Sequence, residues 1–304
     1  MSNAAPSEHL SPNQRAWRRF KRNHPAVAGL LFLVLFLAFI LIWPAISRTD
    51  PNAVSDAQFQ HPSAEHWCGT DFHGRDLFTR IVYGARISLL VAAVGALVSL
   101  VIGVSWGAVA GYAGGRVDES LMRVVDILYS LPSIIFVIVL ITTLEELLKR
   151  WLSGSADTQV RLLFLFVGLG AVSWLTMARI VRGQVLSLRT RSFVYASRAL
   201  GAKFGHILRR HILPNVLGIV IVYLTLTVPS IVLYESFLSY LGLGIQPPMA
   251  SWGSLIAEGA GQLNPIRIYW WLVVYPCVAL VATLVALNFL GDGLRDAYDP
   301  RAQS

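Results

Sequence analysis

The chain has 304 residues, of which 55% are hydrophobic and only 14% are charged. Soluble domains carry about 25% charged residues, so this composition excludes a water-soluble protein with a large aqueous core and indicates an integral membrane protein. The formal net charge is +8, but the basic residues lie in short segments between long apolar runs. Membrane topology accounts for that pattern, and we expect no nucleic-acid partner.

Uncharged runs long enough to cross a bilayer recur along the chain. The run at 26–47 follows a basic tail, is too long for a signal-peptide core and ends in bulky residues, which predicts an uncleaved first transmembrane helix. Five further runs lie at 87–115, 127–144, 162–178, 212–234 and 268–291. The sequence therefore predicts an all-α, polytopic integral membrane protein with six transmembrane helices.

The basic residues predict the orientation of these helices. Most of the 25 Lys and Arg residues fall inside if both termini are cytoplasmic, as the positive-inside rule requires. The expected parts are a cytoplasmic tail at 1–25, a first transmembrane helix at 26–47, a periplasmic or extracellular loop at 48–86, a five-helix core at 87–290 with a cytoplasmic loop at 183–214, and a cytoplasmic tail at 291–304.

Local patterns refine this division. Asp71 and Asp76 lie in a turn-rich part of the outer loop and are expected to cap local backbone rather than bind a metal, with a short helix at 77–81 after them. The segment 236–257 is uncharged, but its Gly and Pro residues would leave backbone groups unpaired in lipid, so an outer loop or re-entrant turn is expected. The second run is rich in glycine, which predicts close helix packing. Its glycines are Gly95, Gly103, Gly107 and Gly111.

Several kinds of active chemistry are missing from the sequence. No Gly-Lys pair occurs, which excludes a phosphate-binding loop of the GxxxxGK[ST] kind, and no HExxH pattern occurs either. Asp126 sits at the edge of an apolar run, where a helix cap or a local pair with Arg123 is expected. Cys68 and Cys277 fall in an outer loop and an apolar run and are not expected to pair. We expect no catalytic, cofactor or metal site.

The loop between the fourth and fifth runs carries the most specific pattern. Phe193, Ser197, Leu200 and Phe204 would fall on one face of a short helix, and small residues around them would let another protein approach the backbone. Gly201 can adopt the positive φ that ends a helix, and Pro214 suits the first turn of the next one.

Four stretches of the chain resemble a known family. Tyr195-Ala196-Ser197, followed by Gly201 and Leu213-Pro214, has the spacing of the EAA loop of ABC-importer permeases, and the remaining three stretches resemble the C-type branch of dipeptide, oligopeptide and nickel permeases. Those three stretches are GTDFHGRD at 69–76, ESFLSYLGLG at 235–244 and NFLGDGLRDAYDP at 288–300. Tyr195 stands where the family has Glu, Ser197 where it has Ala, and His211 where it has Ile.

The resemblance implies a type I ABC importer permease fold (MetI-like) in the bacterial cytoplasmic (inner) membrane. It also implies partners: a second homologous permease subunit, two cytoplasmic ABC ATPase subunits, and a periplasmic or lipid-anchored substrate-binding protein. The chain itself would not be an enzyme. The loop residues expected to couple to an ATPase are Phe193, Tyr195, Ala196, Ser197, Leu200, Gly201, Leu213 and Pro214.

The cargo that the resemblance implies is a short peptide. Nickel or another small solute is the alternative within the family, and an ATP-independent secondary transporter is the alternative from another class. Glu235 ends a span near the outer face. It is a candidate contact for a peptide's amino terminus or a partner for an arginine at the outer mouth, and an interfacial position without such a role is the alternative.

Overall fold

The computed structural model describes residues 12–47, 49–151 and 158–298. Within those ranges the regular structure is helical, and the β structure is limited to an isolated bridge between Thr70 and Asp76. The prediction of an all-α chain is therefore confirmed. The helices are α1 (Pro12–Arg22), α2 (His24–Ser47), α3 (Leu77–Ala113), α4 (Gly115–Tyr129), α5 (Ser133–Trp151), α6 (Thr158–Leu188), α7 (Ser192–Ala199), α8 (Phe204–Ile207), the π-helix η1 (Leu208–Ile212), α9 (Leu213–Tyr240), α10 (Trp252–Gly261) and α11 (Trp271–Tyr298).

Close packing of α3 against α6 forms the centre of the bundle. A Cβ at Gly103 would lie 2.6 Å from the Cβ of Met177, and one at Gly111 would lie 2.8 Å from the Arg182 carbonyl oxygen. Only glycine allows two helices to approach so closely, which confirms the packing predicted for the second run. The helices α9, α11 and α2 then pack in succession on this pair, α9 against α3, α11 against α9 and α2 against α11.

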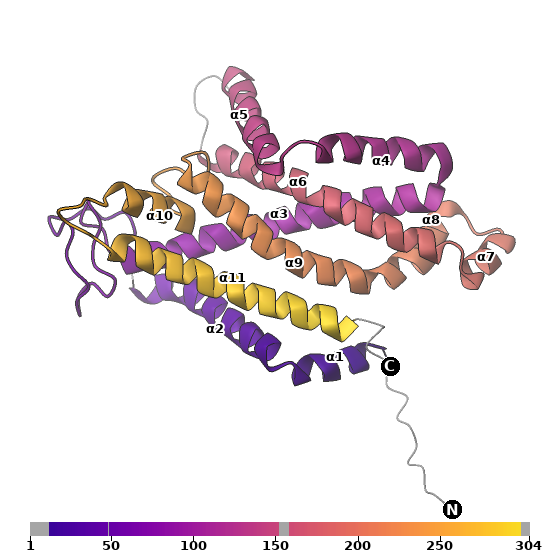
Figure 1. Cartoon of the computed structure of the whole chain (residues 1–304), viewed down its shortest axis with the longest axis horizontal. Helices are drawn as coiled ribbons and strands as arrows, with labels where there is room; N and C mark the ends of the chain where they lie inside the picture. Colours follow the sequence, from indigo (N-terminus) through magenta and orange to yellow (C-terminus); the bar gives the residue numbers. More distant parts are fainter. Residues whose placement is uncertain (1–11, 48, 152–157, 299–304) are drawn as a thin grey trace, which may run out of the picture.

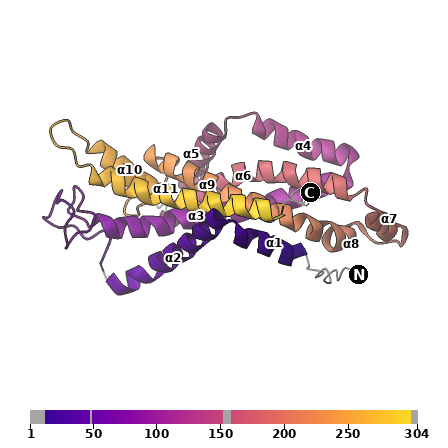
Figure 2. The same cartoon turned by 60° about the horizontal axis from the view of Figure 1, so that its bottom comes forward.

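The long helices place different segments at the two ends of the bundle. The loop at 49–76 and α10 gather at one end, and α7 and α8 lie at the opposite end (Figures 1 and 2). The N-terminal helix α1 packs on the last part of α11, where Ala16 and Phe20 are buried with Ala26 and Ala297. Both described chain ends therefore lie toward the α7 end.

The run predicted as a span at 127–144 does not form the one continuous helix that the prediction assumed. The helix α4 ends at Tyr129, α5 begins at Ser133, and the two meet at an angle of 92°. Pro132 explains the break, since it lacks an N–H and disfavours helical backbone in the residue before it. In the described residues four helices are long and apolar enough to cross a membrane, or five if this bent pair counts as one span. A total of six stays a prediction.

The start of α3 differs from the prediction in one respect. The predicted helix at 77–81 and the second span form one continuous helix, α3. Asp76 caps it, because its carboxylate accepts a 2.8 Å hydrogen bond from the Thr79 N–H. Asp71 likewise accepts from the backbone N–H groups of His73 and Arg75, at 2.8 and 3.0 Å, so both capping predictions are confirmed.

The uncharged segment at 236–257 is not a seventh spanning helix. The helix α9 continues to Tyr240, the chain turns, and α10 begins at Trp252 behind a Ser251–Ser254 capping box. The short helix α10 packs against α9 and α11, so its backbone is covered by protein.

Candidate functional site

The helix α7 has the shape that its sequence predicts. It spans Ser192–Ala199, and Leu200 follows as its C-cap. Gly201 has a φ of +82°, which lets the chain leave the helix through a left-handed residue. A Cβ at Gly201 would meet no atom within 4 Å, so the backbone conformation alone requires glycine here.

One face of α7 exposes apolar side chains. Leu200 is 88% exposed and Tyr195 is 55% exposed, and the Phe193 ring is also exposed. The small residues Ala196 and Gly201 are exposed beside them. Burying a Leu-sized side chain is worth about 1.5–3 kcal/mol, so this surface would gain free energy from contact with another protein.

The opposite face of α7 is anchored to the long helices. Val194 is fully buried in a cluster that includes Tyr112 of α3, Val185 of α6 and Ile212 of η1. The Arg198 guanidinium donates to the Tyr112 hydroxyl at 3.4 Å, and the Tyr112 ring lies 4.8 Å from that of Phe204. A displacement of α7 would therefore be transmitted to the ends of three long helices.

The start of α9 agrees only in part with the prediction that Pro214 lies in the first turn of a new helix. Pro214 lies in the first turn of α9, beside Leu213, as its sequence position indicates. The helical path, however, begins at Phe204, because α8 and η1 run continuously into α9. The wider turns of η1, in which the Leu213 N–H donates to the Leu208 carbonyl, precede the proline. Residues 200–203 alone thus separate α7 from this long helix.

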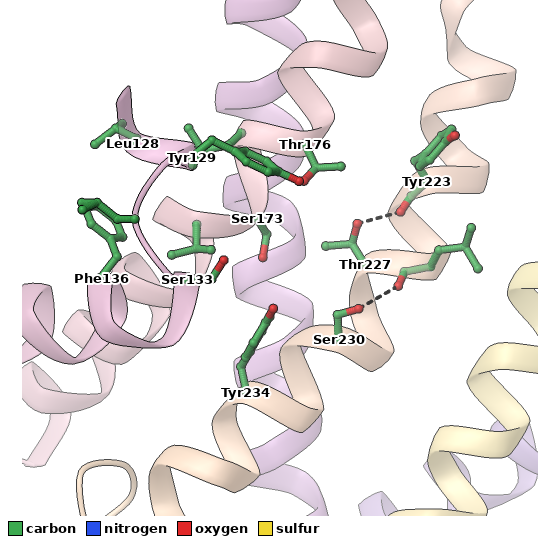
Figure 3. Close-up of a pocket in the computed structure, with 14 residues that line it drawn as sticks. Leu128, Tyr129, Ser133, Phe136, Ser173, Thr176, Tyr223, Thr227, Ser230 and Tyr234 are labelled. Carbon is green, nitrogen blue, oxygen red and sulfur yellow. Dashed lines mark hydrogen bonds between the residues drawn. The ribbon is translucent and has the colours of Figure 1, made fainter. Parts of the chain in front are cut away.

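A cavity of about 260 Å³ lies where the α4–α5 break faces α6 and α9. Figure 3 shows the hydroxyl-bearing side chains that surround it. Thr227 donates to the Tyr223 carbonyl at 2.7 Å and Ser173 to the Leu169 carbonyl at 3.1 Å, which leaves their oxygen lone pairs as acceptors. The described residues that line it are all uncharged. The hydroxyl-bearing residues are Tyr129, Ser133, Ser173, Thr176, Tyr223, Thr227, Ser230 and Tyr234.

The prediction for Asp126, which lies near this cavity, was wrong. Asp126 neither caps its helix nor pairs with Arg123; it accepts a 2.7 Å bond from Arg179 of α6. The Arg179 guanidinium also lies 3.9 Å from the centre of the Tyr129 ring. The local sequence suggested Arg123 because it is one turn away, whereas the bend after α4 brings Asp126 to α6. Since both charges are exposed, the pair adds about 1 kcal/mol or less.

Glu235 lies inside the outer half of the protein. Its carboxylate is 0% exposed and accepts hydrogen bonds from the hydroxyls of Ser88 at 2.8 Å and Ser239 at 2.7 Å. Ser239 in turn accepts from the Ile245 N–H. Its partners in the described part of the chain are serines rather than the expected arginine. The geometry gives no support to a peptide contact at Glu235, which stays a prediction.

A buried cluster of charges at the outer end was not predicted. Arg80 is 2% exposed and contacts Asp71 at 2.7 Å and Glu258 at 2.6 Å. Arg75 reaches the same two carboxylates, at 2.7 and 3.2 Å. The cluster joins the outer loop, α3 and α10. Glu258 lies 178 positions from Arg80, so no local spacing could reveal the pair.

Comparisons with known proteins agree with this arrangement. The profile of the family described as binding-protein-dependent transport system inner membrane component matches residues 103–304. A second profile, the N-terminal TM domain of oligopeptide transport permease C, matches residues 11–63. A chain of the MetNI methionine ABC transporter, solved in inward facing conformations, aligns with a TM-score of 0.55 at 23% identity, covering 73% of this chain and 97% of that one. That likeness shows a shared fold.

Two relatives extend the match over nearly the whole chain. The dipeptide transport system permease protein DppC of Bacillus subtilis is 44% identical over 296 residues, which cover 96% of this chain and 87% of the relative. The oligopeptide transport system permease protein OppC of Escherichia coli K12 is 46% identical over 295 residues, covering 95% and 91%. The protein is therefore a permease subunit of the ABC importer class. It belongs to the family of binding-protein-dependent transport system inner membrane components, beside the C subunits of its peptide branch.

Proposed function

We propose that this chain forms half of the pathway by which an importer carries short peptides across the bacterial inner membrane. The relatives named above are dipeptide and oligopeptide permeases, and ATP hydrolysis is assigned to separate subunits. A second homologous permease completes the pathway as a heterodimer. Two cytoplasmic ABC ATPases and a periplasmic or lipid-anchored substrate-binding protein complete the importer.

The exposed face of α7 is the observation that carries this proposal. Phe193, Tyr195 and Leu200 present apolar surface, while Val194 fixes the helix to the bundle. We assign this face, with Ala196, Ser197, Gly201, Leu213 and Pro214 around it, to the groove of an ATPase subunit. Motion of that groove would move α7 and then α9, whose α8 and η1 extension begins three residues after Gly201. That motion would switch the pathway between two packings of its helices.

The hydroxyl-lined cavity supports a peptide as the cargo. Hydroxyls both donate and accept, so they can bond to the N–H and C=O groups that all peptides share. Among the described residues, those that line the cavity carry no imidazole, the side chain that suits nickel. The alternative of a nickel permease is therefore less well supported. An ATP-independent transporter has no support from the family match.

The proposed topology has six spans, with α4 and α5 together as the third and α6 as the fourth. The tail at 1–25, the loop at 183–214 and the tail at 291–304 are cytoplasmic, and the loop at 48–86 is outside. With Cys68 and Cys277 replaced by serine, a cysteine at Ala202 should be labelled only from the cytoplasmic face. Labelling from outside would overturn the orientation.

Two glycine substitutions test the coupling role. Both Gly201 and Gly205 have open space around their Cβ positions, but only Gly201 has a positive φ. Gly201→Asp adds about 1–2 kcal/mol of backbone strain at the end of α7, whereas Gly205→Asp adds the same charge without it. In the assembled importer, Gly201→Asp should insert normally and reduce uptake while ATP hydrolysis persists. Equal uptake by the two variants would contradict the assignment.

A further inference from the structure

The short helix α1, which precedes the first spanning helix, concentrates positive charge. Five of its 11 residues are lysine or arginine, and none is acidic. Residues 1–25 as a whole contain one acidic residue, Glu8. Like charges one turn apart repel each other and disfavour a helix, so nearby negative charge would stabilise α1. Its basic residues are Arg15, Arg18, Arg19, Lys21 and Arg22.

One face of α1 is fixed to the bundle, which leaves a basic face outward. Ala16 and Phe20 are buried in one cluster with Ala297 of α11, and α1 lies beside the end of that helix (Figure 1). Lys21 and Arg22 are exposed, and neither makes an ion pair with another described residue. The fold therefore holds two cations at a defined place on the surface.

Trp17 adds an aromatic ring to the exposed face. It is 53% exposed, its ring stacks on that of Phe20 at 5.7 Å, and the Lys21 ammonium lies 5.2 Å from the centre of the Trp17 ring. Tryptophan beside lysine and arginine is typical of helices at a membrane surface, where the indole lies among the lipid headgroups. Orienting the chain in a membrane requires the positive charges alone, so topology does not explain this exposed ring.

The position of α1 indicates the depth at which this face lies. Asn23 alone separates α1 from α2. The helix α2 is apolar enough to cross a membrane, and its Leu31 and Leu35 are 58% and 60% exposed, so they face acyl chains. Lys21 and Arg22 therefore lie at the level of the headgroups that border α2, where basic residues attract anionic lipids.

We propose that the exposed face of α1 binds anionic phospholipid, such as phosphatidylglycerol, from the leaflet that surrounds the start of α2. Lys21 and Arg22 pair with the phosphate, Trp17 packs among the headgroups, and the acyl chains run along Leu31 and Leu35. The lipid then supplies negative charge to α1 and holds this helix against α11. That the leaflet is the cytoplasmic one rests on the proposed function, whereas the binding itself does not.

Native mass spectrometry of the full-length permease in detergent tests this surface. With dioleoyl phosphatidylglycerol and dioleoyl phosphatidylethanolamine added at equal concentration, the glycerol lipid should be retained preferentially. Lys21→Gln combined with Arg22→Gln should lower its retention by about fivefold or more, because one basic residue near a membrane surface contributes about that factor. Retention of the ethanolamine lipid should not change.

Two control variants separate this surface from positive charge in general. Arg209→Gln combined with Arg210→Gln removes the same charge from exposed positions of η1, at the same end of the bundle, and should not change the lipid preference. Lys21→Arg combined with Arg22→Lys keeps both charges and should retain the glycerol lipid as the wild type does. The assay uses the permease alone, so its failure would leave the assignment of α7 to an ATPase unaffected.

Three results would overturn the proposal. The first is equal retention of the two lipids by the wild-type permease. The second is an equal loss in the two double-glutamine variants, because lipid binding would then follow total charge. The third is unchanged lipid retention by the Lys21→Gln, Arg22→Gln variant together with weaker co-purification of the ATPase subunits, which would assign the exposed face of α1 to a protein contact instead.

Discussion

The two ends of the bundle differ in the side chains that they bury and expose. At the outer end, buried charged side chains are paired within the chain: Arg80 contacts Asp71 and Glu258, and Glu235 accepts hydrogen bonds from Ser88 and Ser239. At the α7 end, apolar side chains such as Leu200 remain exposed. The outer end therefore pairs its buried charges within the chain, while the exposed apolar side chains around α7 would gain free energy from contact with a partner.

Gly253 in α10 and the two glycines after α7 differ in the space around them. A Cβ at Gly253 in α10 would overlap the Ser236 carbonyl and lie 2.6 Å from the Ser236 Cα. At Gly201 and Gly205, by contrast, a Cβ would meet nothing within 4 Å. A substitution at Gly253 should therefore change the stability of the permease, whereas one at Gly201 should change its coupling.

The largest expected loss of stability follows removal of Arg80. Arg80→Met would leave Asp71 and Glu258 with only Arg75, and breaking a buried pair in this way costs about 3–5 kcal/mol. Thermal unfolding of the purified permease measures the effect. Arg267→Met, at an exposed position of the same outer end, is the control and should unfold at the wild-type temperature. A similar temperature for Arg80→Met would mean that the outer end is not held by this cluster.

The thiol of Cys68 reports on the same end. Burial, with a smaller contribution from Asp76, raises the pKa of Cys68 from 9.0 to about 11. At pH 8 its thiolate fraction should be about 100-fold lower than that of a thiol with pKa 9.0. Maleimide labelling of folded Cys277→Ser protein should be correspondingly slow, accelerate as pH rises toward 11, and become fast on denaturation. Fast labelling of the folded protein at pH 8 would contradict the burial of this loop.

A glycine pair within α10 gives a moderate effect. Gly253→Ala would push α10 away from α9, an overpacking that costs about 1–3 kcal/mol. Gly261→Ala, at the end of the same helix, would meet no atom within 4 Å and should leave stability unchanged. Thermal unfolding of the two variants in parallel makes the comparison, and equal destabilisation would show that α10 is not packed as described.

The smallest effect on stability is expected at the exposed face of α7. Leu200→Ser removes a side chain that contacts solvent. The free energy of unfolding of the permease alone should therefore stay within about 0.5 kcal/mol of the wild-type value. The assembled importer should nevertheless hold its ATPases less tightly, which pull-down of the complex measures. A strongly destabilised permease would mean that Leu200 packs within the chain.

The features that local sequence determines could be predicted. Hydropathy identified the long helices, the positive φ of Gly201 followed from the sequence of α7, and Asp76 was recognised as a cap. Each depends on residues within a few positions of one another, so spacing and residue type were sufficient.

The features that tertiary packing creates could not be predicted. The hydroxyls of the cavity come from α4, α5, α6 and α9, and Glu258 is far from Arg80 in the chain. Arg80 and Arg86, which fall in the outer loop predicted at 48–86, lie inside α3. Arg80 is neutralised there by the carboxylates of Asp71 and Glu258. The break before α5 is caused by Pro132. It was missed because the run at 127–144 that contains this proline is uncharged throughout.

Protection of a single cysteine tests the account most directly. In a Cys68→Ser, Cys277→Ser background, Leu200→Cys places a thiol at the most exposed point of α7, and its maleimide labelling can be compared in the permease alone and in the assembled importer. The account predicts fast labelling in isolation and strong protection once the ATPase subunits are bound. Equal labelling in the two states would contradict the claim that this face seats in an ATPase groove.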